Sequence, residues 1–558
     1  MNSALLAIIA LGLLSLAYRF YSKYIAIKIF ELADLDNKKI PTPAYEFQDD
    51  QDYIPTNNEI LLGHHFSSIA GAAPIVGPAV AAIWGWLPAL IWVIFGVIFL
   101  GACHDMGTLF LSMKYGGNSM AMVAEKLLGK RVRNLFLIII FFLVWMVIAV
   151  FALVIANLFI KFPGSVIPIN FEIIVAVIMG LYIKKKGGSL KIPSILAFLA
   201  LLFMIIVGSN YPINLGDNAL MIWIVFLLIY SFIASTLPVW MLLQPRDYIN
   251  SHQLFVGLGA IIIGLIVTSP KIVAPMYNPS PAGAPPMFPY LFITIACGAI
   301  SGFHGLVSGG TTSKQVKKWK DVRSIGYGSM LSEGLLAVIA TLAVTAGFSS
   351  KLEWHNHYSN WGAANGLSAK ISAFVIGAGK FIAGLGIPEH VSHTVIAVLI
   401  ISFAATSLDT ACRIQRYIVG EFGKTLKIKS LENKYVGSFI AVFSAFLLMV
   451  SSDGGKGGLK IWPLFGATNQ MLAALSLILI SVFLIKHNKK FLNFLLPAIF
   501  IIIITFTGLI FNIYNFNKTS NTSLTLLASC LLLAEVWIII EAFIFIKNHK
   551  NSTAPLQN

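Results

Sequence analysis

Charged residues are scarce in this sequence. Asp, Glu, Lys and Arg make up 11% of its 558 residues, whereas hydrophobic residues make up 57%, and the mean hydropathy is +0.83. In soluble domains the charged share is about 25%. The composition therefore excludes a water-soluble protein and predicts an integral membrane protein in a lipid bilayer.

Cysteine and enzymatic signatures are also scarce. The chain has four cysteines without CxxC or ligand-like spacing, namely Cys103, Cys297, Cys412 and Cys530, so we expect neither disulfides nor a metal site. It contains no Walker A pattern and no HExxH, and its largest polar loop, 31–60, is too short for a catalytic domain. We therefore expect no enzyme, no cofactor and no pump driven directly by ATP.

The formal net charge of +16 does not indicate nucleic-acid binding, because the basic residues lie in short loops between apolar segments instead of forming one patch. When the N-terminus is placed outside and the spans alternate, most of the 39 Lys and Arg residues fall on one side. That bias assigns this side, and the C-terminus, to the cytoplasm. Lys456 and Lys460 are among the few on the other side.

Apolar segments of about 17 to 25 residues predict an all-α fold with about fifteen membrane spans. The first is not expected to be a cleaved signal peptide, since no basic residue precedes it. The expected spans are 4–30, 62–85, 87–113, 133–160, 168–183, 189–208, 219–243, 252–269, 289–310, 328–348, 389–412, 435–451, 461–485, 491–511 and 524–547.

Two of these spans are interrupted by Gly, Ser and Pro, at 63–74 and at 298–310. Irregular backbone survives in a bilayer only where protein or a water-filled cavity satisfies it, so paired breaks indicate the substrate site of a transporter. The topology makes the two broken spans antiparallel. Each precedes a full span, an amphipathic segment (118–128 or 368–385) and three more spans.

This order predicts an inverted five-plus-five repeat of the LeuT type. The expected parts are an N-terminal helix with an acidic cytoplasmic loop (1–60), a first repeat (61–208), two linking helices (209–288), a second repeat (289–485) and C-terminal helices with a tail (486–558).

Several motifs resemble the carbon starvation protein A family. The broken span contains His64-His65-Phe66-Ser67-Ser68-Ile69-Ala70-Gly71, and similar agreement is seen at Pro74–Pro78, Gly85–Leu90, Gly101–Asp105, Gln244–Tyr248, Ser301–His304, Gly309–Gln315, Leu408–Thr410 and Trp462–Gln470. The resemblance covers roughly residues 60–485. It implies uptake of peptides or pyruvate through the bacterial inner membrane when preferred carbon sources run out.

The broken segments supply candidate substrate ligands. Freed amides at half-helix starts carry partial positive charge and can hold a carboxylate. The small residues beside them are Ser67, Ser68, Gly71, Ser301 and Gly302, with His65 and His304 nearby and Asn469 and Gln470 at the start of a later span. Each has a plainer alternative, because small residues allow close helix packing and His, Asn or Gln can link helices by hydrogen bonds.

Candidate coupling residues lie on other spans. Thr406, Asp409 and Thr410 share one helix face and offer oxygen ligands for Na⁺, although Asp409 and Arg413 are also spaced for an ion pair. His104 and Asp105 are a candidate proton relay, but neighbours on a helix diverge by about 100°, so each needs its own partner. Asp105, Glu333 and Asp409 are the obvious intramembrane acids, and Gln244–Asp247 is expected in a cytoplasmic gate or anchor loop.

The sequence thus predicts a secondary transporter that imports a small carboxylate-bearing nutrient, a peptide or pyruvate, together with H⁺ or Na⁺. A channel or a nutrient sensor with a transporter-like body is the alternative. Two broken helices favour alternating access over a static pore. No oligomeric state follows from the residues.

Overall fold

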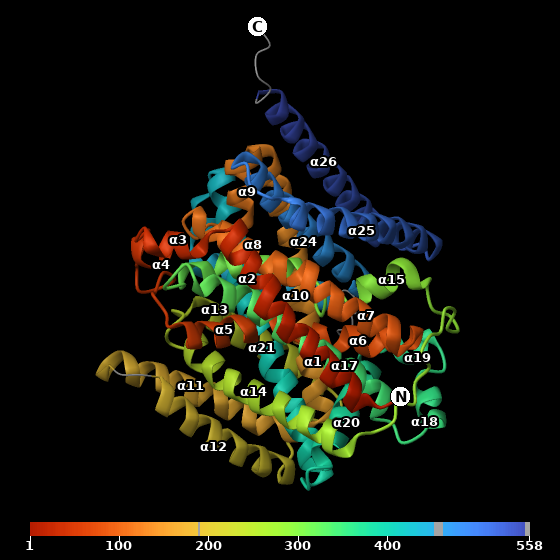
Figure 1. Ribbon diagram of the computed structural model, residues 1–558. Coiled ribbons are helices and arrows are strands. Elements are labelled where there is room, and N and C mark those ends of the chain that lie inside the picture. Colours follow the sequence, from red (N-terminus) through yellow and green to blue (C-terminus); the bar gives the residue numbers. More distant parts are fainter. Residues whose placement is uncertain (188–189, 451–460, 553–558) are drawn as a thin grey trace.

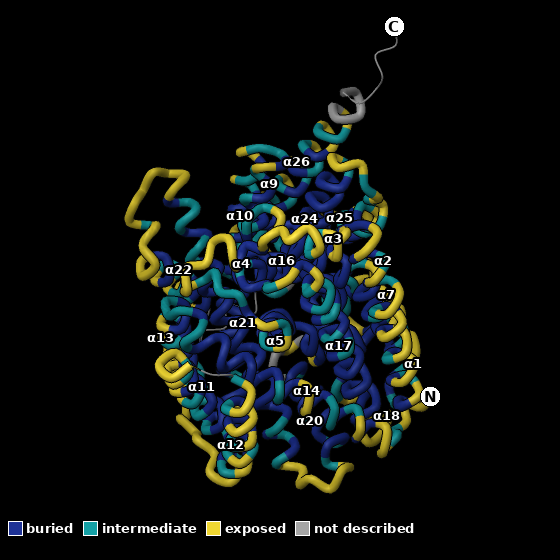
Figure 2. Tube along the Cα trace, turned by 60° about the vertical axis from the view of Figure 1, so that its left-hand side comes forward, coloured by how far each residue is buried: buried dark blue, intermediate teal, exposed yellow. Residues whose placement is uncertain are grey.

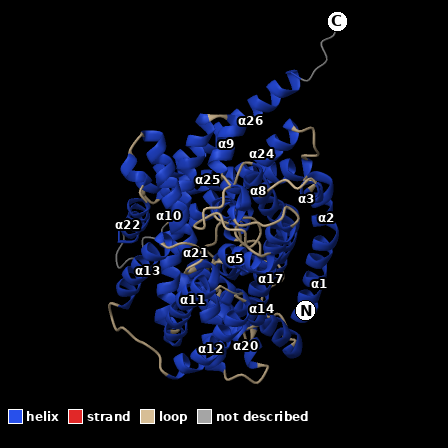
Figure 3. Ribbon diagram, turned by 90° about the vertical axis from the view of Figure 1, so that its left-hand side faces the viewer, coloured by secondary structure: helices blue, strands red, loops and turns tan. Residues whose placement is uncertain are grey.

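The chain folds almost entirely into helices (Figure 3). A computed structural model describes residues 1–187, 190–450 and 461–552, so Lys456 and Lys460 lie outside the described residues. Within the described ranges the only β-type pairings are two isolated bridges. The all-α class is therefore confirmed.

Twelve helical segments are long and apolar enough to cross a membrane. They are Ser3–Ile29, which begins with α1 (Ser3–Leu16); Trp86–Lys114, which contains α7 (Trp86–Gly96) and α8 (Ala102–Lys114); α10 (Lys130–Lys161); Pro163–Lys186 with α11 (Val166–Lys186); α12 (Lys191–Asn210); α13 (Ala219–Thr236); α14 (Leu243–Thr268); Arg323–Ala346 with α17 (Ser329–Ala346); α21 (Glu389–Leu426); Leu464–Lys486 of α24 (Trp462–Lys486); α25 (Leu492–Lys518); and Thr522–Lys547 of α26 (Thr522–Ser552).

The remaining expected spans are also helical. The bent pair α5 (Asn58–Ala70) and α6 (Ala73–Ala81) makes a thirteenth candidate. The other two are α22 (Lys434–Val450), which is shorter, and the separate helices α15 (Met287–Thr294) and α16 (Gly302–Gly310). The count of about fifteen spans is therefore not confirmed, although a helix lies at every expected segment.

Shorter helices fill the connections. The two amphipathic segments form α9 (Met120–Leu128) and α20 (Leu367–Ala383), as expected. The loop 31–60 contains α3 (Leu32–Asn37) and α4 (Pro43–Glu46), and α18 (Lys351–His357) and α19 (Trp361–Asn365) precede α20.

Burial separates central from peripheral helices. Within the apolar 18-residue stretch of each span, α17, α21 and α24 are almost entirely buried, whereas α12 and α26 bury a third of those residues or less. Figure 2 shows this as a buried interior inside a partly exposed shell, and Figure 1 shows α26 projecting from one end of the bundle. The exposed side chains of α12 are apolar, as in Leu196 and Phe203, which are 61% and 62% exposed. Such faces suit contact with lipid tails.

The two broken spans lie against each other in the interior. α5 and the α6 segment differ in direction by 43°, and Gly71 at the break has a φ of +48°, a conformation that favours glycine. α15 and α16 are separated by the non-helical residues 295–301. α5 packs on α16 and α6 packs on α15. A Cβ atom on Gly77 of α6 would lie only 2.4 Å from the Thr294 backbone oxygen.

The boundary predicted between the seventh and eighth spans was wrong. The segment Gln244–Asp247 is not in a cytoplasmic loop, because α14 begins at Leu243 and includes it. Pro245 lies in the first turn, where proline's missing N–H has no helical partner to lose. Arg246 and Asp247 are 1% and 0% exposed, respectively, so this stretch brings a cation and an anion into the protein interior.

We predict that Gly77→Ala destabilises the protein by about 1–3 kcal/mol, because an added methyl group has to displace backbone across the contact between the broken spans. Gly259→Ala in α14 is the matched control, since its Cβ would meet no atom within 4 Å and alanine favours a helix. Thermal unfolding of the detergent-purified variants is the measurement. Equal unfolding temperatures for both variants would contradict the close approach at Gly77.

Candidate functional site

Polar atoms without partners gather on the last turns of α5. Ser67 Oγ, Ser68 Oγ and His65 Nε2 are buried and have no hydrogen-bond partner among the described residues. Leaving such a group unpaired costs about 1–3 kcal/mol. These atoms lie just before the break at Gly71, where the helix backbone also ends. They are atoms with which a polar ligand can pair.

Neighbouring elements hold this turn in place. His65 Nδ1 lies 2.8 Å from Thr312 Oγ1, in the turn that follows α16. Ser407 Oγ of α21 donates to the Ser68 backbone oxygen at 3.0 Å. A Cβ atom on Gly71 would come within 3.0 Å of Ser407 Oγ and of the Phe151 ring. Gly71 therefore contributes close packing and backbone conformation at the break.

The predicted residues at the second break form hydrogen bonds largely with one another. Asn469 Oδ1 accepts the backbone N–H of Phe303 at 2.9 Å, and Asn469 Nδ2 donates to Ser301 Oγ at 3.0 Å. A Cβ atom on Gly302 would lie 2.4 Å from the Asn469 backbone oxygen. Gln470 Nε2 donates to the Phe292 backbone oxygen at 2.8 Å. Asn469 and Gln470 thus link α24 to α15 and α16, as in the alternative of a polar link between helices.

Four titratable side chains meet between α8, α16 and α17. His104 Nδ1 lies 2.8 Å from Asp105 Oδ1, and His304 Nδ1 lies 2.8 Å from Asp105 Oδ2. The other ring nitrogen of His304 is 3.2 Å from Glu333 Oε2, without the alignment of a hydrogen bond. His104 and Asp105 thus contact each other, contrary to the expectation from helix geometry, while Asp105 also has the separate partner His304. We call His104, Asp105, His304 and Glu333 the acid–histidine cluster.

A second network surrounds Arg246. Its guanidinium contacts the carboxylate of Asp409 and donates to Thr406 Oγ1 at 3.1 Å. Tyr230 donates its hydroxyl proton to Asp409 at 2.8 Å, and Thr406 donates to Asp247 at 2.9 Å. His64 Nδ1 lies 2.5 Å from the other oxygen of Asp247. Two of the three predicted cation ligands are thus already bound to protein groups, while Thr410 Oγ1 has no partner within the described ranges.

The alternative pairing of Asp409 with Arg413 is contradicted. Arg413 Nη1 lies 3.5 Å from Asp52 of the loop 31–60, and Nη2 donates to the backbone oxygens of Ala234 and Leu237. Burial alone would raise the pKa of Asp52, but Lys314 and Arg413 outweigh it and hold that pKa below its usual value. The acidic loop is therefore bound electrostatically to α21 and to the turn after α16.

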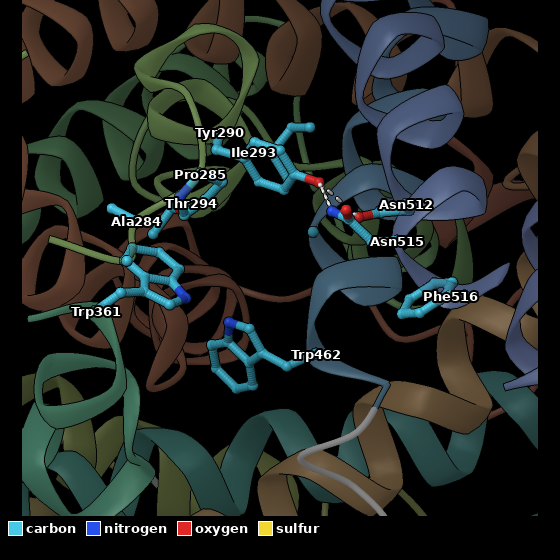
Figure 4. A pocket seen from close by; sticks show the side chains of 12 residues that line it. Ala284, Pro285, Tyr290, Ile293, Thr294, Trp361, Trp462, Asn512, Asn515 and Phe516 are labelled. Carbon is cyan, nitrogen blue, oxygen red and sulfur yellow. Dashed lines mark hydrogen bonds between the residues drawn. The ribbon is translucent and has the colours of Figure 1, made fainter. Parts of the chain in front are cut away.

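A cavity of about 400 Å³ lies beside the second broken span (Figure 4). Tyr290, Trp361 and Trp462 line it, and the Tyr290 hydroxyl donates to Asn512 Oδ1 at 3.1 Å. None of the predicted site residues is among its lining residues. Gly466 lines it one helical turn before Gln470, so the cavity lies next to the predicted site without containing it. The buried unpartnered atoms, not this cavity, define the candidate site.

Charged residues that were not predicted as site residues are also buried in the interior. Arg246 and Asp247 were assigned to a loop, although Pro245 was a signal for a helix start. Glu172 of α11 is 3% exposed and accepts from Ser402 at 3.1 Å, so the set of intramembrane acids was incomplete. Polarity within an apolar span was the available signal for Glu172.

The family model described as "Carbon starvation protein CstA" matches residues 2–353 and 348–508. The "Peptide transporter CstA" of Bacillus subtilis (strain 168) is 32% identical over 526 residues, which cover 88% of this chain and 86% of that protein. The "Pyruvate/proton symporter BtsT" of Escherichia coli (strain K12) is 31% identical over 588 residues, covering 90% and 80%, respectively.

A solved structure, MhsT in complex with L-phenylalanine, matches with a TM-score of 0.46 and 12% identity over 87% of this chain and 98% of that chain. That score is too low to establish a shared fold. Both sequence relatives are named as transporters and not as enzymes. Both the family model and the relatives extend over most of the sequence. This multi-pass membrane protein therefore belongs to the carbon starvation protein CstA family.

Proposed function

We propose that the chain is a secondary active transporter that imports a small carboxylate-bearing nutrient, a peptide or pyruvate, across the bacterial inner membrane. The observation that carries this proposal is the group of buried, unpartnered Ser67, Ser68 and His65 atoms at a helix break. Such donors suit an anion. The names of the two relatives, a peptide transporter and a pyruvate/proton symporter, agree with both substrate classes.

The proposed arrangement keeps the inverted repeat, with residues 61–208 as one half and 289–485 as the other. The N-terminus lies outside and the C-terminus in the cytoplasm, because most Lys and Arg then face the cytoplasm. The contacts between α5 and α16 and between α6 and α15 support this arrangement, since the substrate site of such a transporter lies where the repeats meet.

The contacts of Asp409 help to decide whether the coupling ion is Na⁺ or H⁺. A guanidinium already neutralises its carboxylate, and a sodium ion bound there would be a second positive charge a few ångströms away. Arg246 therefore argues against a sodium site formed by Thr406, Asp409 and Thr410. A proton does not need several oxygen ligands, so the surroundings of Asp409 favour a proton as the coupling ion.

We predict gradient-driven accumulation of radiolabelled pyruvate, or of labelled alanyl-alanine, in proteoliposomes that contain the purified protein. A symporter concentrates its substrate only while the ion gradient lasts, whereas a channel equilibrates it. Uptake is measured with imposed H⁺ or Na⁺ gradients, with unlabelled di- and tripeptides as competitors and empty liposomes as the baseline. Equilibration without accumulation would favour a channel, and the absence of any transport would favour a sensor.

A second prediction concerns Asp409. Asp409→Asn leaves a buried guanidinium short of one anion, which costs about 3 kcal/mol. Adding Arg246→Gln removes that charge and should recover part of the unfolding temperature. Thermal unfolding of the two single variants and the double variant gives the coupling between the two residues. Unchanged stability of Asp409→Asn together with lost cation dependence of uptake would instead identify Asp409 as a ligand of the coupling ion.

A further inference from the structure

The acid–histidine cluster joins α16 of the second broken span to α8 and α17. All four of its side chains are 0% exposed. Asp105 comes from α8, which ends the full span after the first broken span, and His304 lies in the first turn of α16. Glu333 of α17 completes the chain of contacts. Two consecutive α-helices, α16 and α17, and the distant α8 thus place two carboxyl groups around one imidazole.

The cluster contains no fixed positive charge. With both histidines neutral and both carboxyl groups ionised, it carries two negative charges in a fully buried place. Burying even one unpaired ion costs several kcal/mol. Two added protons make the cluster neutral wherever they reside among the four side chains. Its charge therefore depends on bound protons and not on a permanent counter-ion.

The cations on helices packed against α17 are engaged elsewhere. Arg246 of α14 contacts Asp247 and Asp409, Arg323 donates to Ser22 and Tyr18, Lys380 of α20 donates to Ser349, Lys370 of α20 lies over the Trp462 ring, and Lys114 of α8 lies over the Trp319 ring.

The other titratable groups of these helices do not supply a cation either. His65 of α5 interacts electrostatically with the cluster, as does Cys297 in the non-helical segment between α15 and α16. The helices α1, α6 and α7 have no titratable side chain. The remaining titratable side chains of the helices packed against α17 contact groups outside the cluster. His64 pairs with Asp247, Glu59 with Lys191 and His252 with Ser194. Tyr327 donates to the Ile98 backbone oxygen, Cys103 lies near Tyr21, and the Tyr248 ring lies against His252.

Unsatisfied atoms single out Glu333. Both of its carboxylate oxygens, and Nε2 of His104, lack a hydrogen-bond partner in the described part of the chain. A protonated carboxyl group can donate one hydrogen bond, whereas an ionised one only accepts. Since His304 Nε2 is 3.2 Å from Glu333 Oε2, a proton held by either group is shared with the other after a small reorientation.

We propose that Glu333 and His304 bind the proton that is transported with the substrate, with Asp105 and His104 positioning His304. The proton binds from one side of the membrane and leaves to the other, so no covalent bond to substrate forms or breaks. The inference rests on the proposed function and deepens it by naming the residues that bind the coupling proton. His304 also lies near the Ile69 backbone carbonyl, which directly follows Ser68 in the candidate substrate site.

The test uses Glu333→Gln in the full-length protein, reconstituted in proteoliposomes. Two quantities are measured with labelled pyruvate and with alanyl-alanine: accumulation driven by a pH gradient, and exchange against the same unlabelled compound at equal pH. With one proton per substrate, a gradient of about one pH unit supports about tenfold accumulation in the wild type. We expect Glu333→Gln to exchange substrate normally but to show no accumulation above empty liposomes.

Glu535→Gln is the matched control. Glu535 is equally buried but pairs with Thr505 between α25 and α26, outside the repeats, so accumulation should persist. Glu333→Asp keeps an ionisable group and should retain accumulation with a shifted pH profile. That result supports proton binding even if Glu333→Gln does not fold.

Three outcomes would overturn the inference: full accumulation by Glu333→Gln, loss of exchange as well as accumulation in both Glu333 variants, or a wild type driven by Na⁺ alone. If the wild type neither exchanges nor accumulates either compound, the proposed function fails first.

Discussion

Backbone hydrogen bonding inside the bilayer is the constraint on which the rest of this structure depends. In hydrocarbon an unpaired amide or carbonyl group cannot form a hydrogen bond to water, so irregular backbone persists only where protein or a water-filled cavity surrounds it. The peripheral helices obey this rule as uninterrupted helices with apolar outer faces, such as α12. Both breaks lie in the interior, where Asn469 accepts the Phe303 amide and Ser407 donates to the Ser68 carbonyl. The irregular segments are therefore held by side chains from later helices.

Buried charge is handled in two different ways in the same interior. Around Arg246 a permanent cation contacts the carboxylates of Asp409 and Asp247, and His64 contacts the second of them. The acid–histidine cluster has carboxyl groups without such a cation. The first arrangement has a permanent positive charge beside its carboxylates, whereas the second reaches neutrality only by binding protons. The second arrangement suits a group that has to take up and release a proton during a transport cycle.

Hydropathy and small-residue interruptions predicted most of the fold. Both broken spans, the amphipathic α9 and α20 and the all-α class could be predicted because each depends on local composition. The start of α14 could not be predicted from hydropathy, because Arg246 and Asp247 are as polar as a loop and are buried through tertiary pairing with α21 and α5. The proximity of His104, Asp105 and His304 was likewise unpredictable in detail, since it depends on how α8 meets α16. The choice of Arg246 over Arg413 as partner of Asp409 depends on the direction of α14 across α21.

The proposed substrate and proton sites give a physical reason for an anion and a proton to move together. In that proposal a substrate carboxylate at Ser67 and Ser68 adds negative charge near His304, which lies near the Ile69 backbone carbonyl and contacts Asp105 and Glu333. Like charges repel strongly where water is scarce. Protons on the cluster remove that repulsion, so a proton raises the affinity for the anion. By linkage the anion raises the affinity for the proton by the same factor. The reciprocity needs no contact between substrate and Glu333, because the field of the buried charges and the His304–Ile69 approach connect the two places.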